Sequence, residues 1–380
     1  ASRETGEGDL AERLANTYQS EHPGVTTMWA GTVGLNTLFS NDAGFGEFSR
    51  AAHDPGQLEP YELDQLLLAW GYAPLQALAA GRRVMVLFNA LALTLLFFYA
   101  WRLLDVQTAL LAAVFSALSP FFVAHTHLMH LDGLTGSLMV LSLMAFLSFA
   151  DRRKTLDLLL SGAAAGLAWL TKTPAFVLAP ILLIITLLAI SKGGSRTAPT
   201  HSARGLLLSL LAWAGIALFT FILFWPAMWF EPLDTLSRIF SQALGYAGGG
   251  HGDPVFFNGT IYSDGRIPTS VFYFYPLTYL WRSTPLVLLG LALAIPALWQ
   301  HWPPLDRRSA RTAILALLLY ALLFTLFMTL GSKKFDRYLI PVYPALHLVS
   351  AAGWVGPVSY THLRAHETSS MISYAVFCLK

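Results

Sequence analysis

The sequence predicts an all-α polytopic membrane protein with about nine transmembrane helices. Charged residues make up 12% of its 380 residues, whereas soluble domains contain about a quarter, and the mean hydropathy is +0.54. Apolar runs of roughly 17 to 25 residues, the length that crosses a bilayer as a helix, recur along the chain. Because backbone amides in lipid must find partners within their own segment, such runs can only be helices.

Composition also limits the classes of function. The single cysteine, Cys378, excludes an internal disulfide framework and a thiolate metal cluster built from this chain alone. A formal net charge of +2 is too small to indicate nucleic acid as a partner. The expected partner is therefore the lipid bilayer, and the position of each charge relative to it becomes the informative quantity.

Residues 1–83 are expected to lie at one face of the membrane as a loop with juxtamembrane helices. The chain opens in polar sequence without an initiator Met, so we expect a first span upstream of Ala1. The apolar stretch 25–39 is too short to span a bilayer and is expected to lie along the surface. Residues 61–81 fit one amphipathic helix at the interface, which Arg82 and Arg83 would end.

The predicted transmembrane bundle occupies residues 84–356. Its apolar runs are 84–101, 106–124, 133–150, 157–171, 174–191, 205–230, 284–300, 312–331 and 338–356. Most of the 11 tryptophans fall near the ends of these runs, as in an aromatic belt at the membrane interface. The tail 357–380 breaks the pattern, looks like translated adapter sequence, and is expected to be non-native.

Basic residues predict which loops face the cytoplasm. The positive-inside rule places there the loops that contain Arg102, Arg152, Arg153, Lys154, Lys192, Arg196, Arg204, Arg307, Arg308 and Arg311. The intervening loops, including the long loop 231–283, then face outward. We therefore predict a multi-pass protein of the cytoplasmic (inner) membrane whose active face is extracytoplasmic.

A polar stretch from His125 to Gly133 separates two predicted spans. Ionisable side chains at a membrane boundary are costly and are candidates for function. For the histidines the alternative is a wet loop where a helix leaves the membrane. Asp132 is the stronger candidate, because basic residues fall on the same predicted side. His127 and His130 could share a helix face, but no third or fourth ligand can be placed, so no metal is predicted.

One predicted outward loop, 331–338, runs against the positive-inside bias because it carries Lys333, Lys334 and Arg337. A phosphate group at the outer leaflet would explain these cations, since Lys and Arg are the usual partners of phosphoryl oxygens. Snorkelling anchors at the end of a span are the alternative. The glycine-rich segment 248–252 in the long loop fits either a lid over a substrate or an ordinary linker.

The order of these features resembles the GT-C superfamily of membrane glycosyltransferases, and within it the bacterial relatives of the protein O-mannosyltransferases and the aminoarabinose transferases. The resemblance rests on HPGVTTMW at 22–29, the paired arginines at 82–83, Ser-Pro at 119–120, His-Leu-Asp at 130–132, GLAWLTK at 166–172 and KKFDRYLIP at 333–341. It implies a GT-C type bundle with juxtamembrane helices in an outer loop. It also implies transfer of a mannose-like sugar from a polyprenyl-phosphate donor to an acceptor hydroxyl on the extracytoplasmic face, without a metal or other cofactor.

The resemblance also implies roles for single residues. Asp132 matches a carboxylate of the family's second outer loop, which orients the acceptor or the basic groups, and is the candidate catalytic residue. The candidate substrate-binding residues are His22, Lys172, Lys333, Lys334, Arg337 and Tyr338. The lysines and Arg337 would offset the charge that develops on the departing lipid phosphate.

The family's principal acidic pair precedes the His-Pro-Gly stretch, where this chain has only the separate acids Asp9, Glu12 and Glu21. We therefore expect the catalytic base to lie upstream of residue 1, so that this fragment lacks it. The acceptor, whether protein, lipid or glycan, stays open.

Two other functions fit many helices with cations at one face. One is a transporter or flippase for a lipid-linked sugar, and the other is a catalytically inactive membrane scaffold. Transporters commonly show two related halves with polar residues near mid-membrane. The sequence shows no such repeat, and its ionisable residues gather at one predicted face. A glycosyltransferase is therefore the favoured interpretation.

Overall fold

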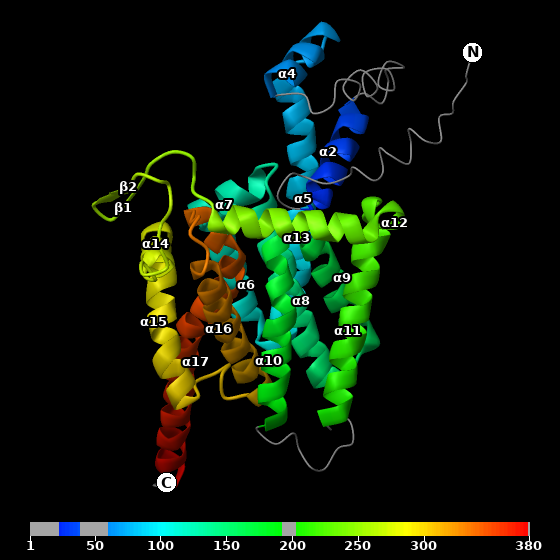
Figure 1. The fold of residues 1–380 in the computed structure, drawn as a ribbon. Helices are drawn as coiled ribbons and strands as arrows, with labels where there is room; N and C mark the ends of the chain where they lie inside the picture. The colour runs from blue at the N-terminus through cyan, green and yellow to red at the C-terminus, as the bar shows by residue number, and fades with distance from the viewer. Residues whose placement is uncertain (1–22, 39–59, 192–202, 379–380) are drawn as a thin grey trace, which may run out of the picture.

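The computed structural model describes residues 23–38, 60–191 and 203–378, with side chains described at 23–38, 64–191 and 203–361. It is a bundle of helices with one two-stranded hairpin (Figure 1). The elements in chain order are α2 (Val25–Leu38), α4 (Pro60–Ala69), α5 (Pro74–Leu103), α6 (Val106–Leu118), α7 (Pro120–His127), α8 (Leu131–Arg152), α9 (Thr155–Thr171), η1 (Thr173–Val177), α10 (Leu178–Ser191), α11 (Ala203–Leu223), α12 (Ala227–Phe230), α13 (Pro232–Gly248), β1 (Val255–Phe257), β2 (Thr260–Tyr262), α14 (Phe274–Arg282), α15 (Pro285–Gln300), α16 (Arg308–Thr329), η3 (Asp336–Val342) and α17 (Tyr343–Cys378).

The described residues contain six helices that are long and apolar enough to cross a membrane, and two bent pairs raise the number to eight. The bent pairs are α6 with α7, which meet at 72°, and α14 with α15, which meet at 119°. The apolar α9, with 17 residues, is just shorter than the others. Each of the nine predicted runs overlaps one of these helices. The predicted all-α polytopic membrane fold is therefore confirmed.

The centre of the bundle is α8, in which every residue from Leu131 to Phe149 is buried. Small residues let its neighbours approach one another closely. A Cβ atom on Gly166 of α9 would lie 2.4 Å from the carbonyl oxygen of Ala217 in α11, and one on Gly353 of α17 would lie 2.0 Å from that of Gly290 in α15. Helix packing in lipid depends on such contacts, because the hydrophobic effect does not drive one apolar helix onto another there.

The junction between α4 and α5 differs from the prediction. α4 ends at Ala69, Gly71 adopts a φ of 82°, and α5 begins at Pro74 and continues through Arg82 and Arg83. A glycine at positive φ followed by a proline at the first helical position breaks the chain, whereas arginine is a good helix former. The prediction of one helix from 61 to 81 that ends at the arginines is therefore wrong.

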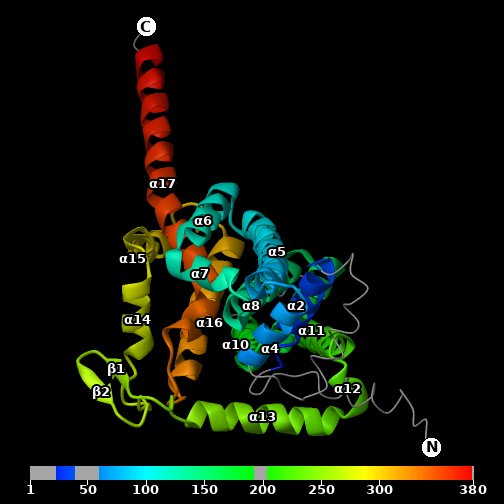
Figure 2. The ribbon, with the colours of Figure 1, turned by 90° about the horizontal axis from the view of Figure 1, so that it is seen from above.

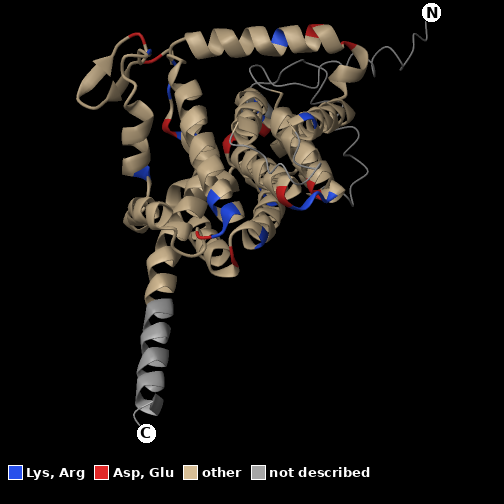
Figure 3. Cartoon of the chain, turned by 90° about the horizontal axis from the view of Figure 1, so that it is seen from below, with Lys and Arg blue, Asp and Glu red and all other residues tan. Residues whose placement is uncertain are grey.

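The loop 231–283 runs along the rim of one end of the bundle, which we call the α13 end (Figures 1 and 2). It contains α13, the β1–β2 hairpin and α14. The long helices carry few charged residues along their length (Figure 3). At the far end from α13, α17 continues through Pro357 to Cys378, and the expectation of a non-native tail at 357–380 stays a prediction.

Candidate active site

Asp132 lies in the first turn of α8 at the α13 end of the bundle, with 1% of its surface exposed. The helix dipole favours a carboxylate at this position. α7 packs tightly against the turn, because a Cβ atom on Gly133 would lie 2.9 Å from the carbonyl oxygen of His125. α7 ends at His127, whereas His130 is the residue that caps α8. The prediction that His127 and His130 share a helix face is therefore wrong.

Lys172 reaches Asp132 from the end of α9. Its ammonium donates a hydrogen bond to Oδ1 of Asp132, and both side chains are buried. The same nitrogen lies 4.6 Å from the centre of the Tyr338 ring. A buried ion pair needs such close geometry, since the two charges have lost their hydration. The structure thus brings together two candidate residues that lie 40 positions apart.

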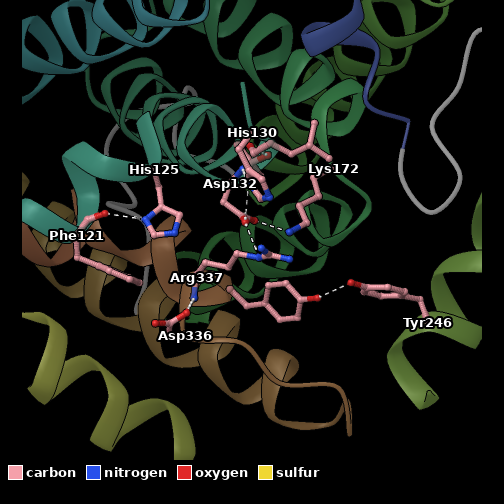
Figure 4. A network of polar contacts seen from close by, with 11 residues as sticks. Phe121, His125, His130, Asp132, Lys172, Tyr246, Asp336 and Arg337 are labelled. Atoms are coloured by element: carbon pink, nitrogen blue, oxygen red, sulfur yellow. Dashed lines mark hydrogen bonds and ion pairs between the residues drawn. The ribbon is translucent and has the colours of Figure 1, made fainter. Parts of the chain in front are cut away.

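Arg337, at the start of η3, approaches the other carboxylate oxygen. Its Nε lies 3.8 Å from Oδ2 of Asp132, which is too long for a hydrogen bond. Within the described residues, neither this Nε nor Oδ2 of Asp132 has a hydrogen-bond partner, although both are buried. Figure 4 shows Lys172, Arg337 and His130 directed at Asp132 from different sides. The cluster therefore retains unused hydrogen-bonding capacity.

His130 is the third group at the carboxylate. Its Nδ1 lies 3.1 Å from Oδ2 of Asp132 and 3.4 Å from the backbone nitrogen of the same residue. This nitrogen either donates to the carboxylate or accepts from the amide, because one ring nitrogen cannot do both at once. The state of His130 therefore determines how much of the second carboxylate oxygen remains free.

The approach of η3 to α8 depends on Gly136. A Cβ atom at this position would lie 2.7 Å from Cα of Pro341, closer than real Cβ contacts. The hydroxyl of Tyr320 on α16 also donates to the carbonyl oxygen of Pro341 at 3.0 Å. Backbone contact and this hydrogen bond hold η3, and with it Arg337, against the first turns of α8.

Cations outnumber carboxylates around the cluster. Asp336 is paired with Arg282 at 2.7 Å, which leaves Asp132 against both Lys172 and Arg337. Lys333 adds a further charge nearby, with its Nζ 3.5 Å from the centre of the Tyr246 ring. The arrangement has a positive surplus, and a surplus of this kind in a region of low dielectric favours binding of an anion.

Lys334 is turned away from this cluster. Its residue is 1% exposed, and its Nζ donates to the carbonyl oxygens of Thr329 at 2.9 Å, Ile267 at 3.2 Å and Gly331. Burial lowers the pKa of its ammonium. A lysine at a helix C-terminus commonly satisfies the last carbonyls, as this one does at the end of α16.

Tyr338 and His22 complete the predicted set. The hydroxyl of Tyr338 donates to that of Tyr246, at 3.2 Å, and so links η3 to α13 (Figure 4). Sequence reasoning missed Tyr246, because nothing in the pattern around it indicates which helix face meets the site. His22 lies outside the described residues.

The glycine-rich segment 248–252 is hydrogen-bonded to the loop 331–338, which carries Lys333, Lys334 and Arg337 and which we call the cation-bearing loop. Ser332 donates through its backbone nitrogen to Ala247, at 3.0 Å, and through its hydroxyl to Gly248, at 3.1 Å. Nε2 of His251 lies 3.0 Å from the carbonyl oxygen of Lys334. Burial lowers the pKa of His251, and the nearby cations act in the same direction. The sequence left two interpretations of this segment, a lid over a substrate and an ordinary linker. These contacts do not fit an ordinary linker.

A second buried carboxylate lies at the opposite end of the bundle, where α8 ends. Asp157 accepts hydrogen bonds from the Tyr99 hydroxyl at 3.1 Å and the Ser148 hydroxyl at 2.8 Å, and Arg102 lies 3.7 Å away. Sequence reasoning placed Asp157 only at the edge of a span. Among the described residues, no three His, Cys, Asp or Glu side chains converge as metal ligands.

Comparisons with known proteins agree with this fold. Residues 75–230 match the family model described as dolichyl-phosphate-mannose-protein mannosyltransferase, and no curated protein matches significantly by sequence. The structure is similar to ArnT from Cupriavidus metallidurans bound to undecaprenyl phosphate, with a TM-score of 0.53 and 18% identity over 74% of this chain and 48% of ArnT.

The archaeal oligosaccharyltransferase AglB from Archaeoglobus fulgidus, in complex with an inhibitory peptide and a dolichol-phosphate, is also similar. Its TM-score is 0.48, with 16% identity over 80% of this chain and 42% of AglB. The chain thus spans about half the length of ArnT, and at these identities the likeness concerns the fold. The family match covers residues 75–230, and the likeness to ArnT shows a shared fold of membrane helices.

Proposed function

We propose that the protein transfers a mannose-like sugar from a polyprenyl-phosphate donor to an acceptor hydroxyl at the extracytoplasmic face of the cytoplasmic membrane. The observation that carries this proposal is the cluster at Asp132, where Lys172 and Arg337 provide more positive charge than one carboxylate balances. The matched family model names a dolichyl-phosphate mannose donor, and ArnT was crystallised with undecaprenyl phosphate. Both ligands are polyprenyl phosphates.

In this proposal Lys172 and Arg337 bind the lipid phosphate and stabilise the negative charge that grows on it as the sugar leaves. Donors fixed in advance around a developing charge are among the largest contributions to enzymatic rates. The Nε of Arg337 is buried without a hydrogen-bond partner in the described residues, so a phosphate oxygen would satisfy it. Lys333 would lie at the rim of the same site.

Asp132 acts as a positioning residue in this proposal. Its Oδ1 already accepts from the ammonium of Lys172, and a carboxylate stabilised in this way is a poor base. Its role is to hold the two cations, so the proton of the acceptor hydroxyl is taken by another group. Lys334 has a structural role, because its three donors are directed at carbonyl oxygens.

The direction of α8 supports placing the site on the extracytoplasmic side. Asp132 lies at its start and Arg152 at its end, so about 30 Å of helix separates them. Arg152 and Arg153 belong to the basic loops that the positive-inside rule assigns to the cytoplasm. The Asp132 cluster would then lie on the other side of the membrane, where a lipid-linked sugar meets its acceptor.

The direct experiment uses the full-length protein with its native upstream sequence, reconstituted in lipid. Binding of undecaprenyl phosphate is compared with binding of the corresponding alcohol, and transfer of label from radiolabelled polyprenyl phosphate mannose is followed over a panel of acceptors. The proposal expects at least tenfold tighter binding of the phosphate, together with release of sugar from the carrier. Equal binding of alcohol and phosphate would contradict it, and movement of intact donor across the bilayer without transfer would assign a flippase instead.

A further inference from the structure

The β1–β2 hairpin presents a bare apolar face. Its strands pair antiparallel, with Phe256 opposite Ile261, and these two side chains are 69% and 66% exposed. Asn258 and Gly259 form the turn with φ angles of 49° and 84°, as a tight two-residue hairpin requires. Side chains directly opposite each other on paired strands share one face of the sheet. Phe256 and Ile261 therefore form one exposed surface.

The other face of the hairpin is packed. Phe257 is buried, with its ring centre 4.5 Å from that of Phe274 and 6.0 Å from that of Trp281, both on α14. Packing on one side gives the hairpin a fixed orientation, which a two-stranded ribbon lacks by itself. The exposure of Phe256 and Ile261 therefore follows from how the hairpin docks on α14.

The composition around this surface excludes an ordinary water-exposed loop. Residues 254–263 contain no charged side chain, and the nearest acids, Asp253 and Asp264, flank the hairpin at its base. Phe272 and Trp281, close to the hairpin's docking site on α14, are also exposed, with 71% and 61% of their areas accessible. Apolar surface that is exposed in this way marks an interaction with a protein or a membrane.

The hairpin docks on a helix that leads directly into a candidate span. α14 meets α15 at 119°, and α15 begins at Pro285, shortly after Trp281. Leu286 and Leu289 on α15 are 59% and 48% exposed, as expected for side chains that face lipid. A tryptophan at the start of a span marks the depth of the membrane interface. Figure 2 shows the hairpin at the outer edge of the molecule, next to α14.

Both ends of the hairpin segment are bonded to the cation-bearing loop. Before the hairpin, His251 contacts the carbonyl oxygen of Lys334. After it, the backbone nitrogen of Ile267 donates to Ser332 at 2.9 Å, and its carbonyl oxygen accepts from the Lys334 ammonium at 3.2 Å. The position of the hairpin is therefore transmitted to the loop that carries Lys333 and Arg337.

From this geometry we infer that the hairpin is a membrane anchor. It inserts the face formed by Phe256 and Ile261 into the lipid interface at the α13 end, and so fixes the height of the loop 331–338 relative to the lipid phosphates. The occupant of this surface is a bilayer. The first statement stands on the hairpin alone, whereas its benefit for phosphate binding rests on the proposed function.

The depth of the hairpin can be measured directly. In full-length protein with Cys378→Ser, single cysteines at Phe256, Leu289 and Ser237 are labelled with an environment-sensitive fluorophore, and the protein is placed in lipid nanodiscs. Leu289 is the lipid-facing control on α15, and Ser237 is an exposed control on α13. Quenching by lipids with a nitroxide near the headgroup should be at least twofold stronger for Phe256→Cys than for Ser237→Cys, and close to that for Leu289→Cys.

Two results would overturn the anchor. In the first, the label at position 256 is quenched by aqueous iodide as strongly as the label at 237 and is not quenched by the lipid nitroxide. In the second, the label at position 256 is protected from both quenchers, which assigns the surface to a protein contact. Neither measurement depends on enzymatic activity, so each is informative even if the proposed function fails.

The link to donor binding has its own test. The double substitution Phe256→Ser and Ile261→Ser should raise the KM for the lipid-linked donor several-fold and leave kcat within about twofold, because the cations remain but lie at a less favourable height. Thr260→Ser, an exposed substitution on the same hairpin, is the matched control and should change neither parameter. An unchanged KM in the double variant would remove the hairpin from donor binding.

Discussion

Asp132 and Asp157 are two carboxylates in nearly the same setting, with different surroundings. Each lies in the first turn of a helix in the bundle, and each is 1% exposed. Both oxygens of Asp157 accept from hydroxyl groups, those of Tyr99 and Ser148. Asp132 accepts from Lys172 through one oxygen, and its other oxygen lies 3.1 Å from Nδ1 of His130 and 3.8 Å from the unpartnered Nε of Arg337.

The difference supports a structural role for Asp157 and the functional role proposed for Asp132. A buried polar group that is fully hydrogen-bonded stabilises its neighbours and has nothing left to offer a ligand. A buried group with unused capacity and uncompensated charge beside it is a candidate for function, because those features have no value for folding alone. Helix position and burial are equal at the two sites, so the donors around each carboxylate determine its role.

The largest expected effect comes from Asp132→Asn. The substitution keeps the shape of the side chain but no longer holds the two cations, so the rate of sugar transfer should fall by about 100-fold or more. The matched control Asp157→Asn should leave transfer within a few-fold and lower only the thermal unfolding midpoint. Radiolabel transfer and thermal unfolding are measured on both variants. Equal losses of activity would show that the two sites do not differ in the way proposed.

The next effect concerns stability at the Asp132 pair. Lys172→Met leaves a buried carboxylate without its main counter-charge and should reduce the free energy of unfolding by about 3–5 kcal/mol. The double variant Lys172→Met, Asp132→Leu removes both charges and should recover much of this loss. Denaturation of Lys172→Met, Asp132→Leu and the double variant in matched detergent gives the coupling energy. A double variant as unstable as the sum of the single ones would contradict a direct interaction.

A smaller effect is expected at the other carboxylate. Tyr99→Phe removes one hydroxyl donor to Asp157 and should cost about 1–2 kcal/mol of stability, since a buried acceptor is left with one partner fewer. Binding of undecaprenyl phosphate should not change, because this residue lies at the far end of α8 from Asp132. A weaker affinity for the lipid phosphate would show coupling between the two ends of the bundle.

The smallest effect is a pH dependence at the edge of the Asp132 site. The folded protein lowers the pKa of His251, so its neutral form is the one that the native state favours. The stabilisation is complete above the unfolded value of about 6.5 and is lost as the pH falls through the lower folded value. The unfolding midpoint should therefore fall slightly in acid, and His251→Gln should reduce this dependence. An unfolding midpoint that rises as the pH falls would contradict this prediction.

Much of the fold could be predicted because lipid restricts the backbone to helices. Each run identified by apolar length overlaps a helix of the structure. Apolar length could not find the break at Gly71 and Pro74, where arginines stood out more than the local turn residues. The meeting of Asp132 with Lys172 and Arg337 could be anticipated from the side of the membrane on which each was placed, together with the resemblance to GT-C enzymes.

Side-chain directions could not be predicted in the same way. Lys333 and Lys334 are adjacent and chemically identical, yet one lies over the Tyr246 ring and the other caps three carbonyls. Their difference depends on where α16 ends and on Ile267, which lies far away in the sequence. Asp157 escaped notice for a similar reason, because hydropathy does not reveal the positions of the two hydroxyls that donate to it or of Arg102 beside it.

The position of the Arg337 guanidinium depends on the small volume of Gly136, and not only on the charges around it. A methyl group there would have to push α8 and η3 apart by about 1 Å to reach an ordinary carbon–carbon contact with Pro341. The guanidinium would move outward with η3, while every ionisable residue stayed the same. Tuning of this site, by natural drift or by engineering, can therefore proceed through a single uncharged position deep in the helix interface.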